Sequence, residues 1–545
     1  MGKIANESTS KTGVVLILLI LGLGFEIESV EGRNILAVEF FGSKSHVITY
    51  LPLLEELARK GDKVTLLSPT KGLSKHPNIT EIFTFGSDEI WSDNNIDLFA
   101  MRERNEEINP WTMLTQVVPK YCREVYDRAD VKALYATDFD LILIQPLFND
   151  CALGLVHKIM SKNGKSKTPL VLFSPTSAPN FLVEKLGGNH PSSFVSNTFI
   201  NLGDDMTFSE RFLNFGMNVL FDGLYSFYYL PVMEELYREK VGSDAPGAGE
   251  ILGRASMILS NGHFSVSRPK PNLPDVVDVG GIHSRKAKPL PKDLEDFISS
   301  GNSDAGFILF SLGTYLRSDL MSPEKRAIFL NVFSRLKQKV IWKYETDDIP
   351  NLPKNVLLSK WLPQQDLLGH GKIRLFMTHC GGGGTEEAIF HGVPLLGMPF
   401  FGDQPLNAQA AEKHGYLVRL DWNDLTEESL TNAINEAINN PKYRENVQRL
   451  STVFRDQIDN PLDRGVFWLE YVMRHKGAPH LRSPARNLSS IQYHSLDVIA
   501  AYLAIIIGTL YVLYAILRWI LRCCCGSTAT KTKFSAKTVR KHKKQ

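Results

Sequence analysis

Three observations in the sequence predict an α/β protein with two Rossmann-like halves and a C-terminal single-pass transmembrane helix. Short apolar runs of the kind found in buried parallel strands alternate with helical stretches, first from residue 34 and again from residue 307. A stretch rich in Pro, Lys and Gly, 269–292, separates the two series as an interdomain linker would. Near the end of the chain, 498–517 is an apolar run of roughly the 20 residues that a bilayer requires.

These observations divide the chain into segments with distinct expected roles. They are a signal peptide (1–32), an N-terminal Rossmann-like domain (33–268), the linker (269–292), a C-terminal Rossmann-like domain with bracing helices (293–480), a stem (481–497), the transmembrane helix (498–517) and a basic cytosolic tail (518–545). The signal peptide is predicted because a short apolar core, 14–23, follows Lys3 and Lys11 and precedes small residues.

The two ends of the chain predict its topology. Because Arg518, Arg522 and a Lys-rich tail follow the apolar run, the positive-inside rule places the tail in the cytosol and the body in the lumen. Lys541 and Lys543, in the final KHKKQ, resemble the dilysine signal that returns membrane proteins to the endoplasmic reticulum; the alternative is a merely solvated basic tail. We therefore expect a single-pass type I protein of the endoplasmic reticulum membrane.

Composition narrows the function further. The 545 residues, 43% hydrophobic and 22% charged, indicate a folded body, and the net charge of +2 argues against a nucleic-acid-binding protein. Cys122 and Cys151 either form a disulfide or remain buried thiols, and no cysteines show metal-ligand spacing. The cysteines at 523–525 follow the membrane span and are open to acylation. Asn78 and Asn487 begin glycosylation triplets, which agree with a luminal body.

The first half opens as a βαβ unit: a strand at 34–40, a helix at 47–60 that ends at Gly61, and a strand at 63–67. It has no G-x-G-x-x-G, so we do not expect a dinucleotide there. His46 lies where the first strand gives way to the helix, at the sheet edge where open α/β proteins bind ligands. Such a histidine is either a helix cap or a catalytic base.

A later aromatic-rich stretch, 221–240, is expected to form a core stripe, with a membrane- or acceptor-facing role as the alternative.

The second half contains a glycine turn suited to an anion. A buried strand, 375–378, ends at His379, four glycines follow, and a helix opens at Thr385. Such a turn directs backbone N–H groups and the positive end of the helix dipole toward negative charge. Trp361 upstream can stack on a base, and Asp403 with Gln404 downstream can bind sugar hydroxyls. Strands are expected at 307–311, 340–343, 356–358, 375–378, 395–398 and 417–420.

In this order and spacing, Trp361, Gln364, His379, the glycine loop, Glu387 and Asp403-Gln404 resemble the signature of the UDP-glycosyltransferases. The resemblance implies a GT-B fold, in which an N-terminal acceptor-binding domain and a C-terminal UDP-sugar-binding domain face a cleft. It implies a UDP-sugar co-substrate, with neither a metal nor another cofactor. The residues expected to hold that UDP-sugar are Ser311, Gly313, Trp361, Gln364, His379, Gly381, Gly383, Gly384, Thr385, Glu387, Asp403 and Gln404.

The resemblance also assigns roles within this set. Trp361 would stack on uracil, Gln364 and Glu387 would bind the ribose or base edge, and Asp403 and Gln404 would hold the sugar. The diphosphate would bind His379, the loop N–H groups, Ser311 and Gly313. Gly383 departs from the family, which often has Asn in this position.

By the same resemblance His46 is the catalytic base, and the acid that orients it is the least secure assignment. The family's acidic position aligns best with Gln145, which carries no charge, and Asp150, five residues further on, could serve instead. Asp138-Phe139-Asp140 resembles the Asp-x-Asp of metal-dependent glycosyltransferases but precedes its strand, so we interpret it as a turn.

We accordingly expect metal-independent, inverting transfer of a hexose from a UDP-sugar to a hydroxyl of a small lipophilic acceptor, as in detoxification. Glucose is favoured over glucuronic acid because the glycine loop and FFGDQPLN look closer to insect-type members of the family. The alternative, motivated by Gln145 and Gly383, is a non-catalytic UDP-sugar-binding partner of an active glycosyltransferase. We also expect contact with membrane lipid around 498–517 and no binding of nucleic acid. The sequence leaves open whether the protein forms homo- or hetero-oligomers.

Overall fold

The computed structural model describes residues 32–525 except 87–88, 91–92, 95, 107–112, 163–167, 198–199, 201, 203–204, 268, 302 and 347–348. The chain forms two compact units, Met1–Ser483 and Pro484–Gln545. The expected signal peptide up to residue 31, and the tail beyond 525 with Lys541 and Lys543, lie outside the described residues.

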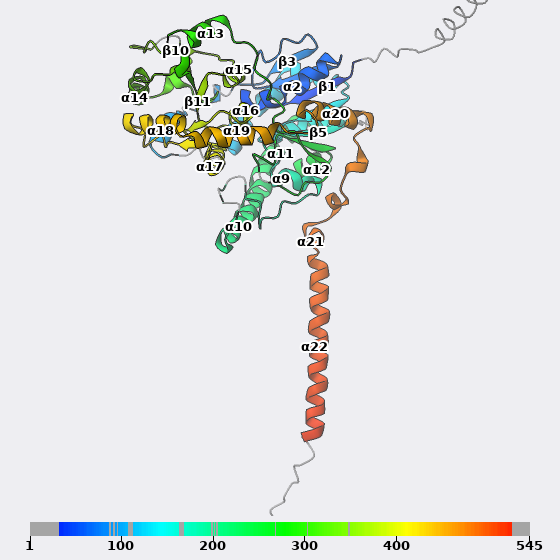
Figure 1. Cartoon of the computed structure of the whole chain (residues 1–545). Helices are drawn as coiled ribbons and strands as arrows, with labels where there is room; N and C mark the ends of the chain where they lie inside the picture. Colours follow the sequence, from blue (N-terminus) through cyan, green and yellow to red (C-terminus); the bar gives the residue numbers. More distant parts are fainter. Residues whose placement is uncertain are drawn as a thin grey trace, which may run out of the picture. The chain divides into compact units, whose positions relative to one another are not determined.

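The first half, coloured blue to green in Figure 1, is built on a parallel sheet. This sheet has seven strands in the order β3-β2-β1-β4-β5-β6-β7. The strands are β1 (Asn34–Val38), β2 (Lys63–Ser68), β3 (Ile79–Phe83), β4 (Leu141–Ile144), β5 (Leu170–Ser174), β6 (Met257–Ser260) and β7 (Val276–Asp278). Successive residues of β1 enter different cores: Leu36 and Val38 pack on one face of the sheet, Ile35 and Ala37 on the other. Burial on both faces explains why these strands are continuous apolar runs.

The strand order reverses direction between β1 and β4, which pair in parallel with Val38 opposite Ile144. In open α/β sheets such a switch point leaves a crevice at the carboxyl ends of the two strands, where ligands bind. The residues that follow the two strands are Glu39 and Gln145. The fold therefore places these two side chains at one crevice, although they are far apart in sequence.

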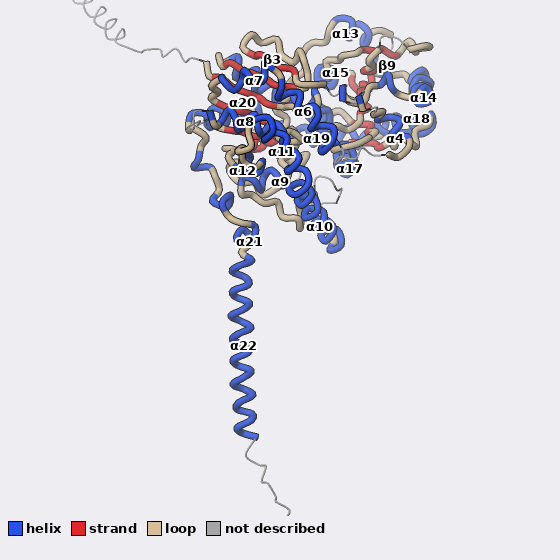
Figure 2. The backbone as a smooth tube through the Cα atoms, turned by 180° about the vertical axis from the view of Figure 1, so that it is seen from behind, coloured by secondary structure: helices blue, strands red, loops and turns tan. Residues whose placement is uncertain are grey.

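The first half also contains helices, most of which pack around this sheet. They are α2 (Lys44–Arg59), α4 (Leu98–Glu103), α6 (Val118–Asp127), α7 (Ala129–Ala133), α8 (Leu153–Met160), α9 (Asn180–Val183), α10 (Phe208–Leu224), α11 (Leu230–Val241) and α12 (Ala248–Gly253). Seen from behind, α6, α8 and α11 lie together over the strands (Figure 2). A disulfide joins Cys122 of α6 to Cys151, which settles the alternative that the sequence left open. Tyr225, Tyr229, Met233 and Tyr237 are buried in the core, so the predicted stripe is confirmed.

The second half repeats the architecture with a six-stranded parallel sheet ordered β10-β9-β8-β11-β12-β13. Its strands are β8 (Phe307–Ser311), β9 (Lys339–Lys343), β10 (Val356–Ser359), β11 (Ile373–Thr378), β12 (Leu395–Gly397) and β13 (Leu417–Arg419), and its helices are α13 (Lys292–Ser299), α14 (Pro323–Ser334), α15 (Gln364–Leu368), α16 (Gly382–His391), α17 (Gln404–Lys413), α18 (Glu427–Asn439) and α19 (Pro441–Arg455). Each strand expected in this half is present, with ends that differ by at most two residues. The sheet switches direction between β8 and β11, so this half also opens a crevice.

The expected linker is shorter than 269–292. Residues 276–278 form β7, which pairs with β6 and closes the edge of the first sheet. A strand of three residues is too short to show a periodic pattern, and the prolines and glycine around it hide its apolar character. The connection between the halves therefore runs only from the end of β7 to the start of α13 at Lys292.

Two segments cross between the halves within Met1–Ser483. Helix α20 (Pro461–Arg474) returns to the first half, where its Glu470 accepts from Lys60 at 2.6 Å and from Arg33 at 3.4 Å. In the other direction, Phe99 of α4 is buried in the second core, 5.4 Å from Phe400 and 5.2 Å from Trp422 between ring centroids. The first crossing is the kind of contact expected of bracing C-terminal helices.

The second unit contains α21 (Ser490–Tyr493) and the 30-residue helix α22 (Leu496–Cys525). The 29 residues Leu496–Cys524 have a mean hydropathy of 2.2 and are long and apolar enough to cross a membrane. The expected span, 498–517, lies inside this helix.

Candidate active site

A cavity of about 1860 Å³ opens between the two halves. It is lined by loops that follow β1, β5 and β6 of the first sheet and β8, β11 and β12 of the second, in line with the switch points described above. His46 lines the cavity from the first half. Every residue expected to hold the UDP-sugar lines it as well: Ser311, Gly313, Trp361, Gln364, His379, Gly381, Gly383, Gly384, Thr385, Glu387, Asp403 and Gln404.

The glycine loop leads directly into α16. The N-cap residue of this helix is Gly381, so no side chain caps the first N–H groups of the helix. A Cβ on Gly313 would lie 2.5 Å from Cε1 of His379, and one on Gly381 would lie 2.6 Å from Nε2 of the same ring. Gly313 also has a φ of +82°, which disfavours any other residue. These two glycines therefore make room for the His379 imidazole beside the helix N-terminus.

At Gly383 there is space that the chain does not use. A Cβ there would have its nearest neighbour at 3.8 Å, the Nε2 of His283. The departure from the family pattern is thus not imposed by crowding, and the backbone N–H groups remain as donors.

Burial lowers the pKa of His379 to about 4, so its ring is neutral at physiological pH and contributes hydrogen bonds, not charge.

The residues assigned to the ribose and sugar are already held in place. Gln364 donates from Nε2 to Oε2 of Glu387 at 2.6 Å. Asp403 accepts from Nδ2 of Asn407 at 2.6 Å and from the Gly382 N–H at 3.2 Å. The side-chain oxygen of Gln404 accepts from the N–H groups of Phe400 and Phe401, which leaves its amide nitrogen as the group able to donate to a ligand.

Trp361 lines the cavity with 55% of its surface exposed. The Nζ atom of Lys44, from the first turn of α2, lies 3.5 Å from the centroid of its ring. A base can stack on the indole only on the other face or by displacing this ammonium group.

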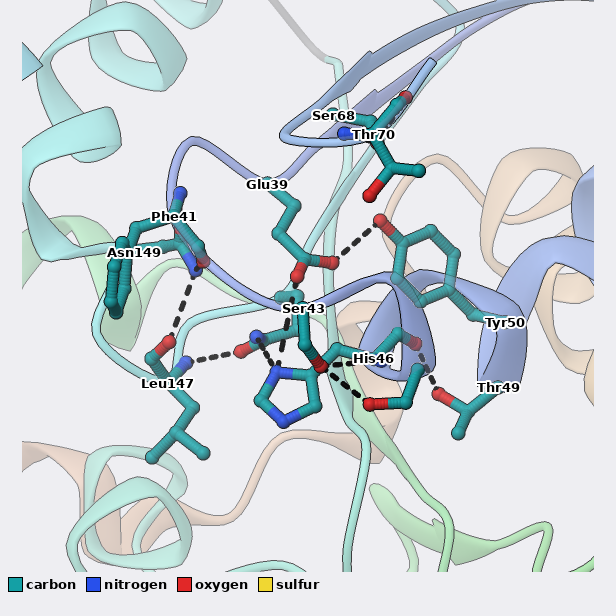
Figure 3. A network of polar contacts seen from close by, with 12 residues as sticks. Glu39, Phe41, Ser43, His46, Thr49, Tyr50, Ser68, Thr70, Leu147 and Asn149 are labelled. Carbon is teal, nitrogen blue, oxygen red and sulfur yellow. Dashed lines mark hydrogen bonds and ion pairs between the residues drawn. The ribbon is translucent and has the colours of Figure 1, made fainter. Parts of the chain in front are cut away.

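His46 enters the cavity from the start of α2, where Ser43 caps the helix by accepting from the His46 N–H at 3.2 Å. Its Nδ1 atom faces Glu39, whose Oε1 lies 3.9 Å away (Figure 3). Nε2 of Gln145 lies 3.4 Å from the same nitrogen. The other Glu39 oxygen accepts from the Tyr50 hydroxyl at 2.8 Å. Burial lowers the pKa of His46 to about 4, so that the imidazole is neutral and able to accept a proton.

Asp150 does not occupy the position expected of the orienting acid. Its carboxylate is 2% exposed and accepts from the hydroxyls of Tyr225 at 2.7 Å and Tyr229 at 2.9 Å. It follows β4 in a 3₁₀ turn beside the disulfide-bonded Cys151, and this turn directs its side chain into the core instead of the cavity. The carboxylate near His46 is that of Glu39, which sequence reasoning missed because it placed residue 39 inside the strand expected at 34–40, whereas β1 ends at Val38.

Sequence reasoning also missed a polar contact between the halves. Asn261, after β6, donates from Nδ2 to Oε2 of Glu386 at 2.9 Å. His283 lies nearby, with ring nitrogens 3.9 Å from Glu386 and 3.9 Å from Glu387. Burial raises the pKa of Glu386 to about 8 and lowers that of His283 to about 4. Both groups are therefore largely uncharged near neutral pH.

The Asp-x-Asp motif has a structural use. The Asp140 carboxylate accepts from the N–H of Asn34 at the start of β1, at 2.8 Å. Asp138 pairs with Lys162 at 2.7 Å. This agrees with its interpretation as a turn that precedes β4.

Comparison with known proteins gives consistent matches. Residues 36–531 match the family model described as "UDP-glucoronosyl and UDP-glucosyl transferase". The chain is 35% identical to UDP-glucuronosyltransferase 2B19 of Macaca fascicularis over 489 residues, 86% of this chain and 90% of that protein. It is 34% identical to UDP-glycosyltransferase UGT5 of Dactylopius coccus over 502 residues, 90% of this chain and 93% of that protein.

Solved structures extend the comparison to the fold. The calicheamicin glycosyltransferase CalG4 matches with a TM-score of 0.53 at 19% identity, over 82% of this chain and 99% of that chain. The glycosyltransferase VinC, solved in complex with dTDP, matches with a TM-score of 0.52 at 17% identity, over 81% of this chain and 100% of that chain. These proteins confirm the expected GT-B fold, and the family match together with the relatives above means that the chain belongs to the UDP-glycosyltransferase family and is a glycosyltransferase.

Proposed function

We propose that this enzyme transfers a hexose, with glucose as the preferred sugar, from a UDP-sugar to a hydroxyl of a small lipophilic acceptor. The observation that carries the proposal is the placement of His46 on one side of a cavity whose other side holds the whole donor signature, Trp361 to Gln404. A base and a sugar nucleotide held across one cavity are the two requirements of direct displacement. The apolar residues of the first half that line the cavity, such as Met113, Leu114 and Phe181, favour a lipophilic acceptor.

In this mechanism the neutral His46 accepts the proton of the acceptor hydroxyl through Nε2. The acceptor oxygen forms a bond to the anomeric carbon while the bond from that carbon to the UDP oxygen breaks on the opposite face, which inverts the centre. General-base assistance of this kind contributes about 10²–10⁴-fold to rate. The departing diphosphate gains negative charge, and His379 with the N–H groups at the start of α16 is positioned to stabilise it.

The preference for glucose is supported by the charge around Asp403. This carboxylate lines the cavity, and among the described residues its hydrogen-bond partners are an amide and a backbone N–H, not a basic side chain. A glucuronate carboxylate bound against it would meet a like charge, whereas a neutral hexose offers hydroxyl donors. The names of the Macaca relatives favour glucuronic acid instead, so both donors belong in the test.

We further propose that α22 anchors the enzyme in the endoplasmic reticulum membrane with the catalytic body in the lumen. The supporting observations are the apolar helix Leu496–Cys524 and the basic sequence that follows it. In this topology the disulfide between Cys122 and Cys151 forms in an oxidising compartment.

The test uses membranes from cells that express the full chain, permeabilised with detergent and supplied with small phenols and either UDP-glucose or UDP-glucuronic acid. We expect a glucoside, detected by mass spectrometry, to form faster than a glucuronide. The His46→Ala variant is the matched control, expected to bind UDP as the parent does and to lose about 10²–10⁴-fold in rate. A faster glucuronide would overturn the donor preference, and UDP binding without any product would favour the non-catalytic partner.

A further inference from the structure

We propose that Glu39 is the positioning carboxylate of His46, in place of the acid that is missing at Gln145. The inference rests on the proposed function, because it assumes that His46 is the base. It concerns a residue that lies on a different strand from the position where the acid was expected.

The sheet topology places Glu39 where an orienting acid is needed. Parallel strands β1 and β4 are neighbours, with Val38 opposite Ile144, so that residues 39 and 145 leave the sheet side by side. The helix that carries His46 begins after the loop from β1. Either position can therefore present a carboxylate to the same imidazole.

Gln145 cannot supply what an acid would supply there. Its side-chain oxygen accepts from the Leu147 N–H at 2.5 Å, which turns its NH₂ group toward Nδ1 of His46 at 3.4 Å. An NH₂ group can donate to Nδ1 but cannot accept from it. By itself, Gln145 thus favours the tautomer with the proton on Nε2, in which the atom that should take the acceptor's proton is already protonated.

Glu39 opposes that preference. Its Oε1 atom lies 3.9 Å from Nδ1 of His46, is fully buried and, within the described part of the chain, has no hydrogen-bond partner of normal geometry, although the Gln145 amide is near enough to stabilise its ionised form. A Cβ on Gly42 would lie 1.8 Å from this oxygen, so the loop has a glycine where the oxygen needs space. A buried acceptor without a well-formed hydrogen bond is destabilising, which a purely structural role does not explain.

As an acceptor for Nδ1–H, Glu39 would leave Nε2 free and would stabilise the imidazolium that forms when His46 takes the proton. The distance of 3.9 Å is an ion-pair distance, longer than a hydrogen bond, and contacts of this kind commonly shorten when substrate binds. The groups that face Glu39 are Tyr50 and His46 from α2 and Gln145 after β4. Burial raises the pKa of Glu39 to about 8, and the imidazolium would favour its ionised form.

The first test is Glu39→Gln, which keeps the size of the side chain and an oxygen for Tyr50. We expect kcat to fall at least about 10-fold with the affinity for UDP unchanged, a smaller loss than the roughly 10⁴-fold caused by removing a triad aspartate, because this contact is longer. The pH dependence gives a second readout: kcat/KM of the parent should rise through about pH 8, and this rise should be absent in Glu39→Gln. Asp150→Asn is the matched control, since it removes a buried carboxylate of the same half that does not face His46, and its kcat should be retained.

A second variant separates positioning from folding. Adding Gln145→Asp to Glu39→Gln places a carboxylate on β4, beside the same nitrogen, and should restore most of the lost kcat. If Glu39→Gln turns over like the parent, or if the second carboxylate restores nothing to a folded, UDP-binding protein, the inference is wrong.

The tautomer of His46 can also be observed without turnover. In protein labelled with ¹⁵N-histidine, the His46 signals are identified by their absence in His46→Ala. Above pH 8, where Glu39 is ionised, we expect the proton on Nδ1 in the parent and on Nε2 in Glu39→Gln. The same tautomer in both would overturn the role of Glu39, and this outcome is distinct from a failure of the proposed function, which would appear as UDP binding without transfer by the parent.

Discussion

Replacement of Trp361 by Ala tests how the cavity holds the donor base. The indole is 55% exposed, so its removal opens no cavity in the core and should not unfold the chain. In the free protein the ammonium of Lys44 lies 3.5 Å from the ring centroid. A base that stacks on this face therefore gains contact with the indole and displaces the Lys44 ammonium from it.

The expected magnitude is the difference between these two contacts. A base stacked on an aromatic side chain contributes about 1–3 kcal/mol, and a cation–π contact at an exposed site about 0.5–1 kcal/mol. The net contribution of Trp361 to UDP binding is then about 0.5–2 kcal/mol, which corresponds to a loss of affinity of about 2- to 30-fold in Trp361→Ala.

Isothermal titration of the purified full chain with UDP measures this loss. Phe227→Ala serves as the control, because Phe227 is an aromatic residue that is 86% exposed and does not line the cavity. Equal affinity in Trp361→Ala and the parent would refute stacking. Lys44→Met should bind UDP about 2- to 5-fold more tightly if the base displaces the ammonium, and weaker binding would refute that displacement.

Three further predictions concern other parts of the chain. Gly383→Asn, at a position where a Cβ has room, should add one hydrogen bond to the donor and tighten UDP binding about 2- to 10-fold by titration; weaker binding would mean that the loop is already filled. Burial raises the pKa of Glu386 to about 8, so near neutral pH the folded state keeps a proton that the unfolded chain releases. The free energy of unfolding should therefore fall between pH 6.5 and 8.5, by on the order of 2 kcal/mol from this group. Over the same pH range, Tm should fall less in Glu386→Gln than in the parent. Deletion of 541–545 should let the enzyme leave the endoplasmic reticulum, as measured by glycan processing and microscopy. Continued retention would contradict the dilysine hypothesis.

The second half was predictable almost strand by strand because each strand has the same local signature. A continuous apolar run such as 307–311 or 375–378 ends at a glycine or a polar residue, and the resulting strands of five and six residues are too short for typical buried helices. The first half gave weaker signals. β7 has three residues set among prolines and a glycine, so its apolar character was hidden inside the stretch interpreted as a linker.

The donor residues were predictable for a related reason: Trp361, His379, Glu387 and Asp403 occur in one continuous stretch, where sequence order and spatial order agree. The partner of His46 was not, because it depends on which strands are neighbours. A search for a missing acid along the chain from Gln145 leads to Asp150, but one 3₁₀ turn is enough to send that side chain into the core. The sheet instead makes β1 the neighbour of β4, so an acid directly after either strand is close to the same imidazole. If Glu39 has the role proposed above, the catalytic pair requires a carboxylate at the switch point of the sheet, and the strand that supplies it can change without altering the fold.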